Sequence, residues 1–246
     1  MNISIILAAG EGTRMKSKTP KVLHKRCGKP ILEYVIDVSK FANVEKNYVV
    51  VGHGGDEVRE YFKDEDVVFK TQPMGEQYPY GTGYAVMQAI DYIEDDANVL
   101  ILYGDTPLIT TKTIEELLAY HKENNYKGTV LTAYVEDPTG YGRIIRDENG
   151  EISKIVEQKD SKEEELKIKE INSGIYCFKG KYLKEALGEI DNNNAQGEYY
   201  ITDVITILKA KNQKVGAFLI DNPDEIYGIN SRVQLAFCEK IMRQRI

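Results

Sequence analysis

The chain begins with a short apolar run, Ile3–Leu7, that leads directly into Ala8-Ala9-Gly10-Glu11-Gly12-Thr13-Arg14. An isolated apolar run of this length predicts a buried strand. The small residues and two glycines after it let the backbone approach a ligand closely and turn its N–H groups toward a phosphate. A glycine turn after the first strand is where α/β folds bind nucleotides, although this spacing matches neither the dinucleotide fingerprint nor the P-loop.

Predicted strands and helices alternate through the first half of the chain. The strand-like segments are Ile3–Leu7, Tyr48–Val51, Val67–Phe69 and Val99–Tyr103, and the helix-like segments are Pro30–Phe41, Gly83–Ile93 and Thr113–Asn124. This alternation implies right-handed crossovers and a Rossmann-like α/β fold, in which a mostly parallel sheet is flanked by helices on both faces.

The pattern changes after Gly128. Two strand-like segments, Arg143–Arg146 and Ile152–Val156, flank Asp147-Glu148-Asn149-Gly150, whose Asn-Gly pair is a strong hairpin signal. The other predicted elements are strands at Thr129–Val135, Ile175–Phe178 and Val215–Ile220, and helices at Asp160–Glu170, Leu183–Ile190 and Ile201–Lys211. We therefore expect one compact α/β domain with a β-rich lobe inserted in its second half.

Basic residues are concentrated in one short segment. The whole chain carries 32 basic and 39 acidic residues, a net charge of −7, which argues against non-specific binding of nucleic acid. Between Arg14 and Lys29, however, there are seven basic residues and no acidic one. Such a block is either a solvated loop or an anion site. Its place directly after the glycine turn favours a polyphosphate site.

Composition also limits the compartment. No apolar run approaches the ~20 residues that a membrane span needs, and the opening residues lack the basic region of a signal peptide. The three cysteines, Cys27, Cys177 and Cys238, are not clustered, which argues against a disulfide scaffold and against a Cys-rich zinc site. The sequence thus predicts a cytoplasmic protein that binds neither membrane nor nucleic acid.

A predicted buried strand, Val99–Tyr103, ends in Gly104-Asp105. Because the carboxyl ends of parallel strands form the ligand edge of a sheet, Asp105 is expected beside the glycine turn. A carboxylate facing polyphosphate suits Mg²⁺, which takes one or two carboxylates together with substrate phosphates. An ordinary turn or N-cap aspartate before Thr106-Pro107 fits the same position equally well.

The segment Asn192–Tyr200 is rich in amide and hydroxyl groups and precedes a predicted helix. Such groups supply the donors and acceptors that sugar hydroxyls need. A plain turn at Gly197 is the alternative.

Taken in order, these segments resemble the sugar nucleotidylyltransferases. The signature L-x-x-G-x-G-T-x-M, followed by P-K, is present as Leu7, Gly10, Gly12, Thr13, Met15, Pro20 and Lys21. Leu102–Leu108 resembles the family's metal-binding strand end, and Gly228–Arg232 resembles its closing metal segment. The segments that resemble the family's sugar pocket are Tyr141–Ile144, Ile155–Glu157, Glu170–Ile175 and Asn192–Asp203.

The resemblance implies the fold of the nucleotide-diphospho-sugar transferases, with a β-rich sugar-binding lobe, and a role for each matching residue. Arg14, Lys21 and Asp105 are the expected catalytic residues, with Arg14 and Lys21 neutralising the triphosphate. Asp105 and Asn230 are the expected Mg²⁺ ligands. The expected nucleotide-binding residues are Leu7, Ala8, Ala9, Gly10, Gln72, Gln77, Gly81 and Thr82. The expected sugar-binding residues are Tyr103, Gly142, Glu157, Asn172, Tyr199 and Thr202.

One segment departs from the family pattern. The family usually reads Gln-x-Glu-Gln-Leu-Gly-Thr before the helix, whereas this chain has the longer Gln72–Thr82. We therefore expect Gln72, which follows the strand directly, to be the glutamine that reads uracil, with Gln77 as the alternative. Tyr78 and Tyr80 are candidates for extra stacking surface near the base.

The implied reaction transfers uridylyl from UTP to N-acetylglucosamine 1-phosphate, giving UDP-N-acetylglucosamine and pyrophosphate for cell-wall precursors. The nucleophile is already an anion, so the reaction needs positioning and charge neutralisation rather than a strong base. A sibling enzyme with another nucleotide or sugar is one alternative. A domain that senses sugar nucleotides without catalysis is another.

The resemblance also divides the chain. Residues 1–229 would form the nucleotidylyltransferase domain, and residues 230–246 would begin a linker helix, with Val233, Phe237 and Ile241 at helical spacing. In the family this linker leads to an acetyltransferase β-helix domain that makes the full-length protein a homotrimer. Hexapeptide repeats of that domain do not occur in this sequence.

Overall fold

A computed structural model describes residues 1–245 of the chain. Its helices and strands, in chain order, are β1 (Asn2–Ala8), β2 (Lys25–Arg26), β3 (Lys29–Pro30), α1 (Ile31–Phe41), β4 (Lys46–Val51), α2 (Gly55–Tyr61), β5 (Val68–Thr71), α3 (Thr82–Met87), β6 (Asn98–Tyr103), α4 (Thr111–Glu123), β7 (Gly128–Tyr134), β8 (Arg143–Arg146), β9 (Ile152–Val156), α5 (Glu163–Leu166), β10 (Glu170–Lys179), α6 (Gly180–Leu187), α7 (Asp203–Ala210), β11 (Val215–Leu219) and α8 (Arg232–Arg245).

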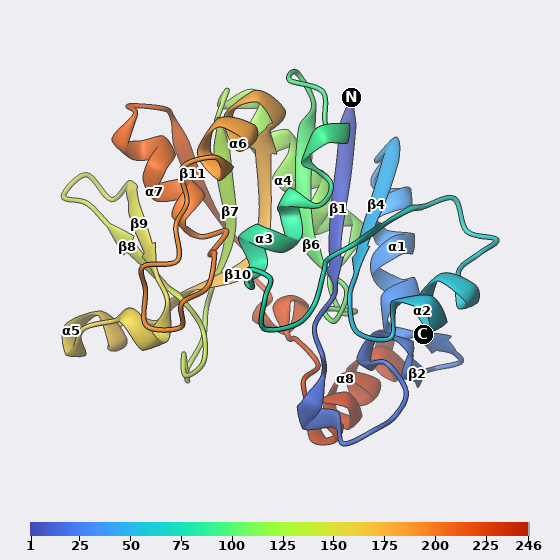
Figure 1. Cartoon of the computed structure of the whole chain (residues 1–246). Helices are drawn as coiled ribbons and strands as arrows, with labels where there is room; N and C mark the ends of the chain where they lie inside the picture. Colours follow the sequence, from blue (N-terminus) through green and yellow to red (C-terminus); the bar gives the residue numbers. More distant parts are fainter. Residues whose placement is uncertain (246) are drawn as a thin grey trace.

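A mixed sheet forms the centre of the described residues, in the strand order β11-β7-β10-β6-β1-β4-β5 (Figure 1). Neighbouring strands from β6 to β5 are parallel, as are β11 and β7. Strand β10 runs antiparallel to both of its neighbours, β6 and β7. The hairpin β8–β9 extends from β10 as the predicted β-rich lobe. The sheet is therefore mostly parallel, as the sequence predicts.

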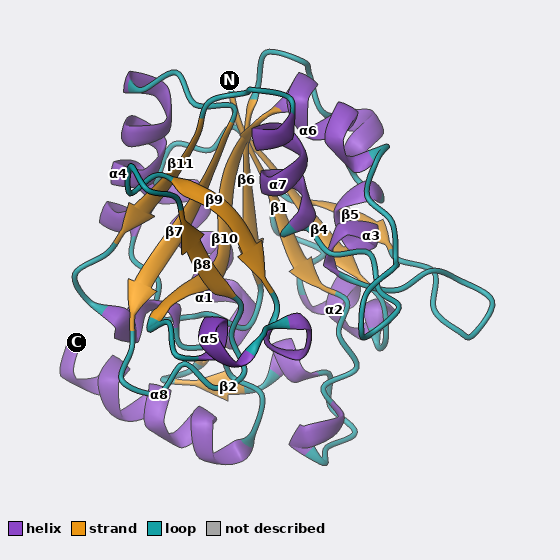
Figure 2. Cartoon of the chain, turned by 90° about the vertical axis from the view of Figure 1, so that its left-hand side faces the viewer, coloured by secondary structure: helices purple, strands orange, loops and turns teal. Residues whose placement is uncertain are grey.

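Side-chain alternation along β1 places a hydrophobic core on each face of the sheet. Ile3, Ile5 and Leu7 pack with the apolar residues of α3, α6 and α7, whereas Ile6 and Ala8 pack with those of α1, α2 and α4. Figure 2 shows the strands lying between these two helical layers. Strand β1 lies inside the sheet, between β6 and β4, so the turn after β1 lies within the ligand edge and not at its margin.

A third apolar cluster lies beyond the carboxyl ends of the strands. Met15 and Ile31 pack there against Leu235, Cys238 and Met242 of α8. Figure 1 shows α8 beside the dark-blue segment that follows β1. The segment that follows β1 and the last described helix thus meet at the ligand edge. Of the predicted terminal helix, Ile246 lies outside the described residues.

Several elements differ in length from their predictions. The predicted strand Ile175–Phe178 is the end of the ten-residue β10, whose first half contains polar residues that hide it from an apolar-run search. The predicted helix Asp160–Glu170 shortens to α5, and the predicted Gly83–Ile93 divides into α3 and a 3₁₀ turn at Ile90–Tyr92. Helix α2 has no counterpart in the prediction. Within residues 1–245, no helix is both long and apolar enough to span a bilayer.

Candidate active site

The turn after β1 and the end of β6 lie side by side at the carboxyl edge of the sheet. Strands β1 and β6 pair in parallel register, with Leu7 opposite Tyr103. The backbone N–H of Gly104 donates to the carbonyl oxygen of Leu7 at 2.9 Å. Asp105 therefore lies next to the glycine turn because the parallel pairing of two buried strands places it there, as expected from the sequence.

Lys21 joins this edge from the basic segment. Its Nζ lies 2.5 Å from Oδ2 of Asp105 and 3.1 Å from Oδ1 of Asn230. These partners lie 84 and 209 residues away along the chain. The Lys21 side chain packs closely against the backbone of Gly12 (φ 61°). A Cβ added at Gly12 would lie only 2.8 Å from the Lys21 Cβ. Glycine at position 12 thus allows the turn and Lys21 to pack in contact.

A cavity of about 500 Å³ opens over this cluster. The predicted catalytic, nucleotide and metal residues that line it are Leu7, Ala8, Ala9, Gly10, Arg14, Lys21, Gln72, Gly81, Thr82, Asp105 and Asn230, and Tyr103 from the predicted sugar set lines it as well. Gln77 is the one predicted nucleotide residue among the described residues that lies outside its lining.

Gln72 and Gln77 occupy different environments. Gln72 is only 3% exposed and lines the cavity, and its backbone N–H continues the ladder from β4 to β5 by donating to the carbonyl of Val51 at 2.8 Å. Gln77 is exposed, and its side chain folds back toward Gly75. Burial in the cavity wall therefore favours Gln72 as the group that could read a base.

A second cavity of about 240 Å³ continues from the first. Gly142, Glu157, Asn172 and Thr202, all predicted sugar residues, line it. The wall between the two cavities is shared by Thr82, Tyr103, Gly140, Tyr141, Ser173 and Glu198. The structure therefore brings these four predicted sugar residues together directly beside the predicted triphosphate site.

Tyr199 lies in neither cavity wall. Its ring packs against the core, while its backbone N–H donates to Tyr80 and its carbonyl accepts from Gly83, each at 2.8 Å. The neighbouring Tyr200 lines the second cavity, and its hydroxyl accepts from the amide of Gln196 at 2.7 Å. Adjacent residues in an extended segment face opposite ways, and the sequence alone does not say which of two tyrosines faces the ligand.

Burial sets the protonation of the groups around the second cavity. It raises the pKa of the Glu157 carboxyl above its usual range, against a smaller opposing contribution from Thr202. It likewise raises the pKa of Tyr103 and of Tyr176. Both phenols thus stay neutral at physiological pH and can donate as well as accept hydrogen bonds.

Two buried hydroxyls at this cavity make no hydrogen bond of full geometry within residues 1–245, although Asn172 lies near enough to interact with the first and Glu157 with the second. They are the oxygens of Tyr176 and Thr202, and both residues contribute to the cavity lining. A buried polar atom without a partner is costly, so such atoms mark places where water or ligand completes the structure. The second cavity is accordingly built to receive a polar molecule.

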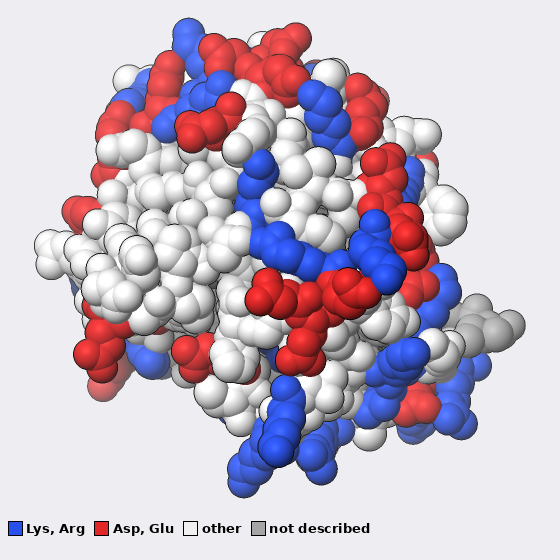
Figure 3. All heavy atoms as spheres, turned by 45° about the vertical axis from the view of Figure 1, so that its right-hand side comes forward, with Lys and Arg blue, Asp and Glu red and all other residues white. Residues whose placement is uncertain are grey.

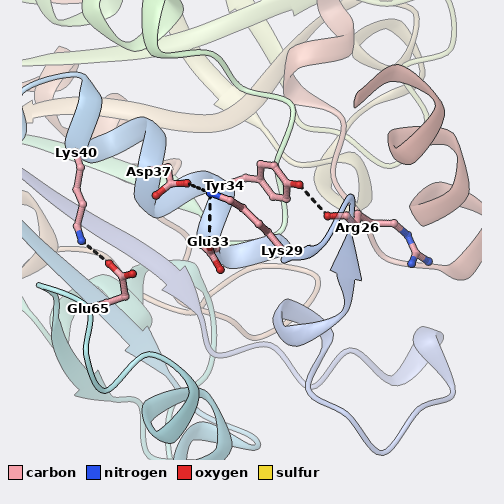
Figure 4. Close-up of polar contacts among 7 residues, drawn as sticks. All are labelled: Arg26, Lys29, Glu33, Tyr34, Asp37, Lys40 and Glu65. Carbon is pink, nitrogen blue, oxygen red and sulfur yellow. Dashed lines mark hydrogen bonds and ion pairs between the residues drawn. The ribbon is translucent and has the colours of Figure 1, made fainter. Parts of the chain in front are cut away.

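The basic segment divides into two groups of cations. Lys29 forms ion pairs with two carboxylates of α1: its Nζ lies 2.8 Å from Asp37 and 3.3 Å from Glu33 (Figure 4). Arg26 accepts at its carbonyl from the Tyr34 hydroxyl (2.8 Å) and pairs with Glu239. These contacts fix the segment to the fold and leave Arg14 and Lys21 facing the cavity.

The surface over this part of the fold is basic. Figure 3 shows Lys and Arg side chains gathered on the lower part of the molecule, the level at which Figure 1 places α8 and the segment after β1. Lys16, Lys18 and Lys25 of that segment are exposed. A positive surface around a cavity raises the local concentration of anionic ligands.

Asp105 and Asn230 form a donor set that fits Mg²⁺. A carboxylate and an amide oxygen converge on a single cation, the ammonium of Lys21, so both can face one charge. Among the described residues, no cluster of three or more His, Cys, Asp and Glu could hold a metal ion. Mg²⁺ bound by few protein ligands completes its shell with water and substrate phosphates. The arrangement therefore suits a metal that arrives with a phosphate ligand.

Several cavity residues were not singled out from the sequence. Tyr141, Ser173 and Glu198 lie where the two cavities meet, and Gln234 lies beside Asn230. Gln234 accepts from the backbone N–H of Asn230 through Oε1 at 2.8 Å, and its own N–H donates to the hydroxyl of Ser231, the residue before α8, at 3.3 Å. The Asn-Ser-x-x-Gln spacing at 230–234 was the available signal, since it marks a helix start.

Comparisons with known proteins identify the family of this chain. Residues 3–223 match the family described as nucleotidyl transferase. The chain is 53% identical over 244 residues to the bifunctional protein GlmU of Clostridioides difficile (strain 630), covering 99% of this chain and 52% of that protein. It is 54% identical over 243 residues to the GlmU of Alkaliphilus metalliredigens (strain QYMF), with the same coverage of 99% and 52%. The chain thus spans about half the length of the curated relatives that it matches.

Solved structures share the fold at low identity. A UDP-glucose pyrophosphorylase complexed with UDP-glucose has a TM-score of 0.79 at 19% identity, over 100% of both chains. A putative glucose-1-phosphate thymidylyltransferase from Bacillus anthracis has a TM-score of 0.77 at 21% identity, covering 99% of this chain and 96% of that one. These structures confirm the predicted fold class, and the family match confirms the resemblance inferred from the motifs. The chain belongs to the nucleotidyl transferase family.

Proposed function

We propose that this chain transfers uridylyl from UTP to N-acetylglucosamine 1-phosphate, releasing pyrophosphate and forming UDP-N-acetylglucosamine. The observation that carries the proposal is the continuity of two cavities, one containing Lys21, Asp105 and Asn230 and the other lined by sugar-type hydroxyl and amide groups. A triphosphate and a sugar phosphate bound in these cavities would meet at their shared wall. The proposal is supported further by the two relatives that are 53% and 54% identical to this chain, both of which are named bifunctional protein GlmU.

The residues of the first cavity would bind the nucleotide. The backbone of Leu7–Gly10 and the Gly81-Thr82 pair would contact uridine and phosphates, while Gln72 would read the uracil edge from its buried position. Arg14 would neutralise the phosphates from the rim, with Lys21 acting beside it. Since pyrophosphate leaves with added negative charge, cations positioned before the reaction stabilise the transition state more than they stabilise the bound substrate.

The sugar 1-phosphate would supply the nucleophile. One of its phosphate oxygens attacks the α-phosphorus of UTP in line, and the bond from that phosphorus to the bridging oxygen of pyrophosphate breaks. Two polyanions must be held close together, so the main work of the protein is positioning and charge neutralisation. Gly142, Glu157, Asn172 and Thr202 would hold the sugar, together with Tyr103. Tyr200, which lines the cavity, would join them rather than the core-packed Tyr199.

Asp105 and Asn230 would hold Mg²⁺ beside the triphosphate. When bound there, the ion would supply Lewis-acid polarisation and neutralise phosphate charge. The protein's contribution is to hold a carboxylate and an amide at converging positions from two distant segments.

We also propose that α8 begins a linker to a further, acetyltransferase domain, and that the longer protein is a cytoplasmic homotrimer serving cell-wall precursor synthesis. The supporting observations are the length of the relatives, about twice that of this chain, and their description as bifunctional. Light scattering on the longer protein tests the assembly, and a monomeric mass would contradict it.

The transfer reaction is tested by pyrophosphate release with UTP and N-acetylglucosamine 1-phosphate. Parallel assays replace UTP with dTTP, and the sugar with glucose 1-phosphate. We expect the UTP and N-acetylglucosamine 1-phosphate pair to give the highest kcat/KM. A preference for another pair would identify a sibling enzyme, and absence of turnover with every pair would leave only a binding role.

A further inference from the structure

Lys21 occupies the place between the two proposed metal ligands. Its Nζ lies 2.5 Å from Asp105 Oδ2 and 3.1 Å from Asn230 Oδ1. The Lys21 and Asp105 side chains are only 12% and 14% exposed, so water shields this pair poorly. An ammonium in contact with both oxygens fills the position that a divalent cation bound by the same two oxygens would need.

We propose that Lys21 is a positioning residue that stands in for the metal in the nucleotide-free protein. Its ammonium keeps Asp105 and Asn230 together and blocks a free divalent cation from their oxygens. When a nucleotide enters, Lys21 releases this pair and turns to the phosphate oxygens. This inference rests on the proposed function, because it takes Asp105 and Asn230 as metal ligands.

The Lys21 side chain is suited to such a transfer. Its stem packs against Gly12, where an added Cβ would lie 2.8 Å from the Lys21 Cβ and 3.6 Å from its Cδ, so the root of the side chain is fixed. Lysine carries a compact charge on a flexible stem with three rotatable donors. Lys21 also lines the main cavity beside Arg14 and the glycine turn. A small movement of the ammonium alone would therefore exchange the Asp105 carboxylate for a phosphate.

Asp105 has no second cation in contact within the described residues. Its ion pair is with Lys21, and Arg14 has no ion pair at all within residues 1–245. Departure of Lys21 would leave the Asp105 carboxylate, which is only 14% exposed, without a compensating cation, and such a largely desolvated charge is unfavourable. Lys21 thus leaves Asp105 favourably only when another cation replaces it there and a phosphate receives the ammonium. The two events are coupled, which makes nucleotide and metal binding mutually dependent.

The coupling predicts weak metal binding without nucleotide. Without nucleotide, a divalent ion must displace the Lys21 ammonium, which then gains no new partner. The apparent affinity of the protein for the divalent ion is therefore lowered by the free-energy cost of that displacement. Removing the ammonium while keeping the apolar stem should lift this cost. Lys21→Met is the matching change, and Lys18→Met is its control, since Lys18 is an exposed member of the same basic segment and removes the same charge.

The test is a titration of the nucleotide-free protein with Mn²⁺, in which the electron paramagnetic resonance signal of the unbound ion measures how much has bound. We expect Lys21→Met to bind Mn²⁺ about tenfold more tightly than the unaltered protein, and Lys18→Met to bind as the unaltered protein does. Adding Asp105→Asn to Lys21→Met should abolish the gain. Equal or weaker binding by Lys21→Met would overturn the inference, as would a gain that survives Asp105→Asn.

Two further measurements keep the outcome clear. Thermal unfolding shows whether Lys21→Met is folded, and Lys21→Arg supplies a second variant that keeps a cation and should keep weak Mn²⁺ binding. Tight binding by Lys21→Arg would also contradict the inference. Because no substrate is present, failure of the uridylyl-transfer assay would leave this result intact, and failure here would leave the transfer proposal intact.

Discussion

The side-chain oxygen of Thr82 accepts a hydrogen bond from the backbone N–H of Ile201 at 3.1 Å. This bond joins the first residue of α3, in the wall of the nucleotide cavity, to the segment that carries the sugar-cavity residues. The backbone of Tyr199 adds two more bonds: its N–H donates to the carbonyl of Tyr80, and its carbonyl accepts from the N–H of Gly83. The two cavities are therefore joined by one small hydrogen-bonded unit, and a change in this unit should affect both ligands.

Replacing Thr82 by valine keeps its shape and removes the acceptor. The N–H of Ile201, a buried residue, then loses its partner, which should lower the free energy of unfolding by about 1–3 kcal/mol. We also expect higher KM values for both UTP and the sugar phosphate. Thr82→Ser keeps the oxygen and serves as the control in urea unfolding and steady-state kinetics. An increase in only one of the two KM values would contradict the shared role.

Gln72 and Gln77 can be separated by matched substitutions to alanine. Loss of the buried Gln72 amide should raise KM for UTP at least tenfold and reduce the preference for UTP over CTP, because an unpaired base edge would remain in the cavity. Gln77→Ala should leave both quantities within about twofold, since Gln77 is exposed and outside the cavity lining. The reverse order of effects would assign uracil reading to Gln77.

Asp105→Ala should remove most of the turnover while the fold remains. The residue follows β6 at the ligand edge and makes its ion pair with Lys21, so its loss affects the charge of the cavity rather than the core. We expect kcat to fall by roughly 10²- to 10³-fold, by analogy with the loss of other transition-state charge partners. Circular dichroism checks the fold. Near-normal kcat at saturating Mg²⁺ would exclude Asp105 as a metal ligand.

Tyr176→Phe should leave the unliganded protein as stable as before, or stabilise it by up to about 1 kcal/mol. The Tyr176 oxygen is buried and makes no hydrogen bond of full geometry within residues 1–245, with only a weak interaction with Asn172, so its removal relieves a desolvation cost. Tyr48→Phe is the comparison, because the Tyr48 hydroxyl in the same core cluster donates to the carbonyl of Tyr92 at 3.3 Å. Differential scanning calorimetry should show a larger loss for Tyr48→Phe. A clear loss for Tyr176→Phe would reveal a hidden partner.

Asp203 makes stability depend on pH. Burial, with smaller contributions from Asp191 and Asp160, raises the pKa of Asp203 from 3.8 to about 6. The folded chain therefore binds more protons than the unfolded chain between these values, and this carboxyl lowers stability as the pH rises from about 4 to about 6. Asp203→Asn should remove that loss. Because the carboxyl is partly exposed and begins a helix, we expect a gain of only about 1 kcal/mol at pH 8 and less at pH 4.

Urea unfolding of Asp203→Asn at both pH values measures the difference. Asp224→Asn, at an exposed position in a turn, controls for the general effect of removing one negative charge. The same gain at pH 4 and pH 8 would show that the carboxyl itself is not responsible.

Much of the fold follows from periodicity that the sequence displays openly. Strands such as β1 and β6 are mostly apolar, with Ser4 as a polar exception in β1, because both of their faces are covered by helices. Strand β10 is equally buried but contains Asn172-Ser173-Gly174 in its first half, and its pairing with β7 shifts register between Asn172 and Tyr176. Ser173 donates to the carbonyl of Leu131, and Asn172 accepts from the N–H of Gly174. These local hydrogen bonds satisfy the polar side chains of Asn172 and Ser173 inside the sheet. A search for apolar runs in the sequence would assign the same residues to a loop.

The site was predictable as a set of residues but not as an arrangement. Motif order singled out Lys21, Asp105 and Asn230, yet only the fold shows that one ammonium contacts both oxygens. The choice between Tyr199 and Tyr200 depends on which way an irregular segment turns, and no periodic signal records that. Gln72 was favoured because it follows a strand, and its burial agrees with that preference.

The site draws on both ends of the chain, since the first strand leads into the glycine turn and Asn230 precedes the last described helix. On a ribosome, a nascent chain with β1 to β11 complete would already contain every strand of the sheet. It would still lack the amide of Asn230 and the covering cluster around Leu235 and Cys238. Synthesis order would therefore keep the proposed pair of metal ligands, Asp105 and Asn230, incomplete until the sheet is finished.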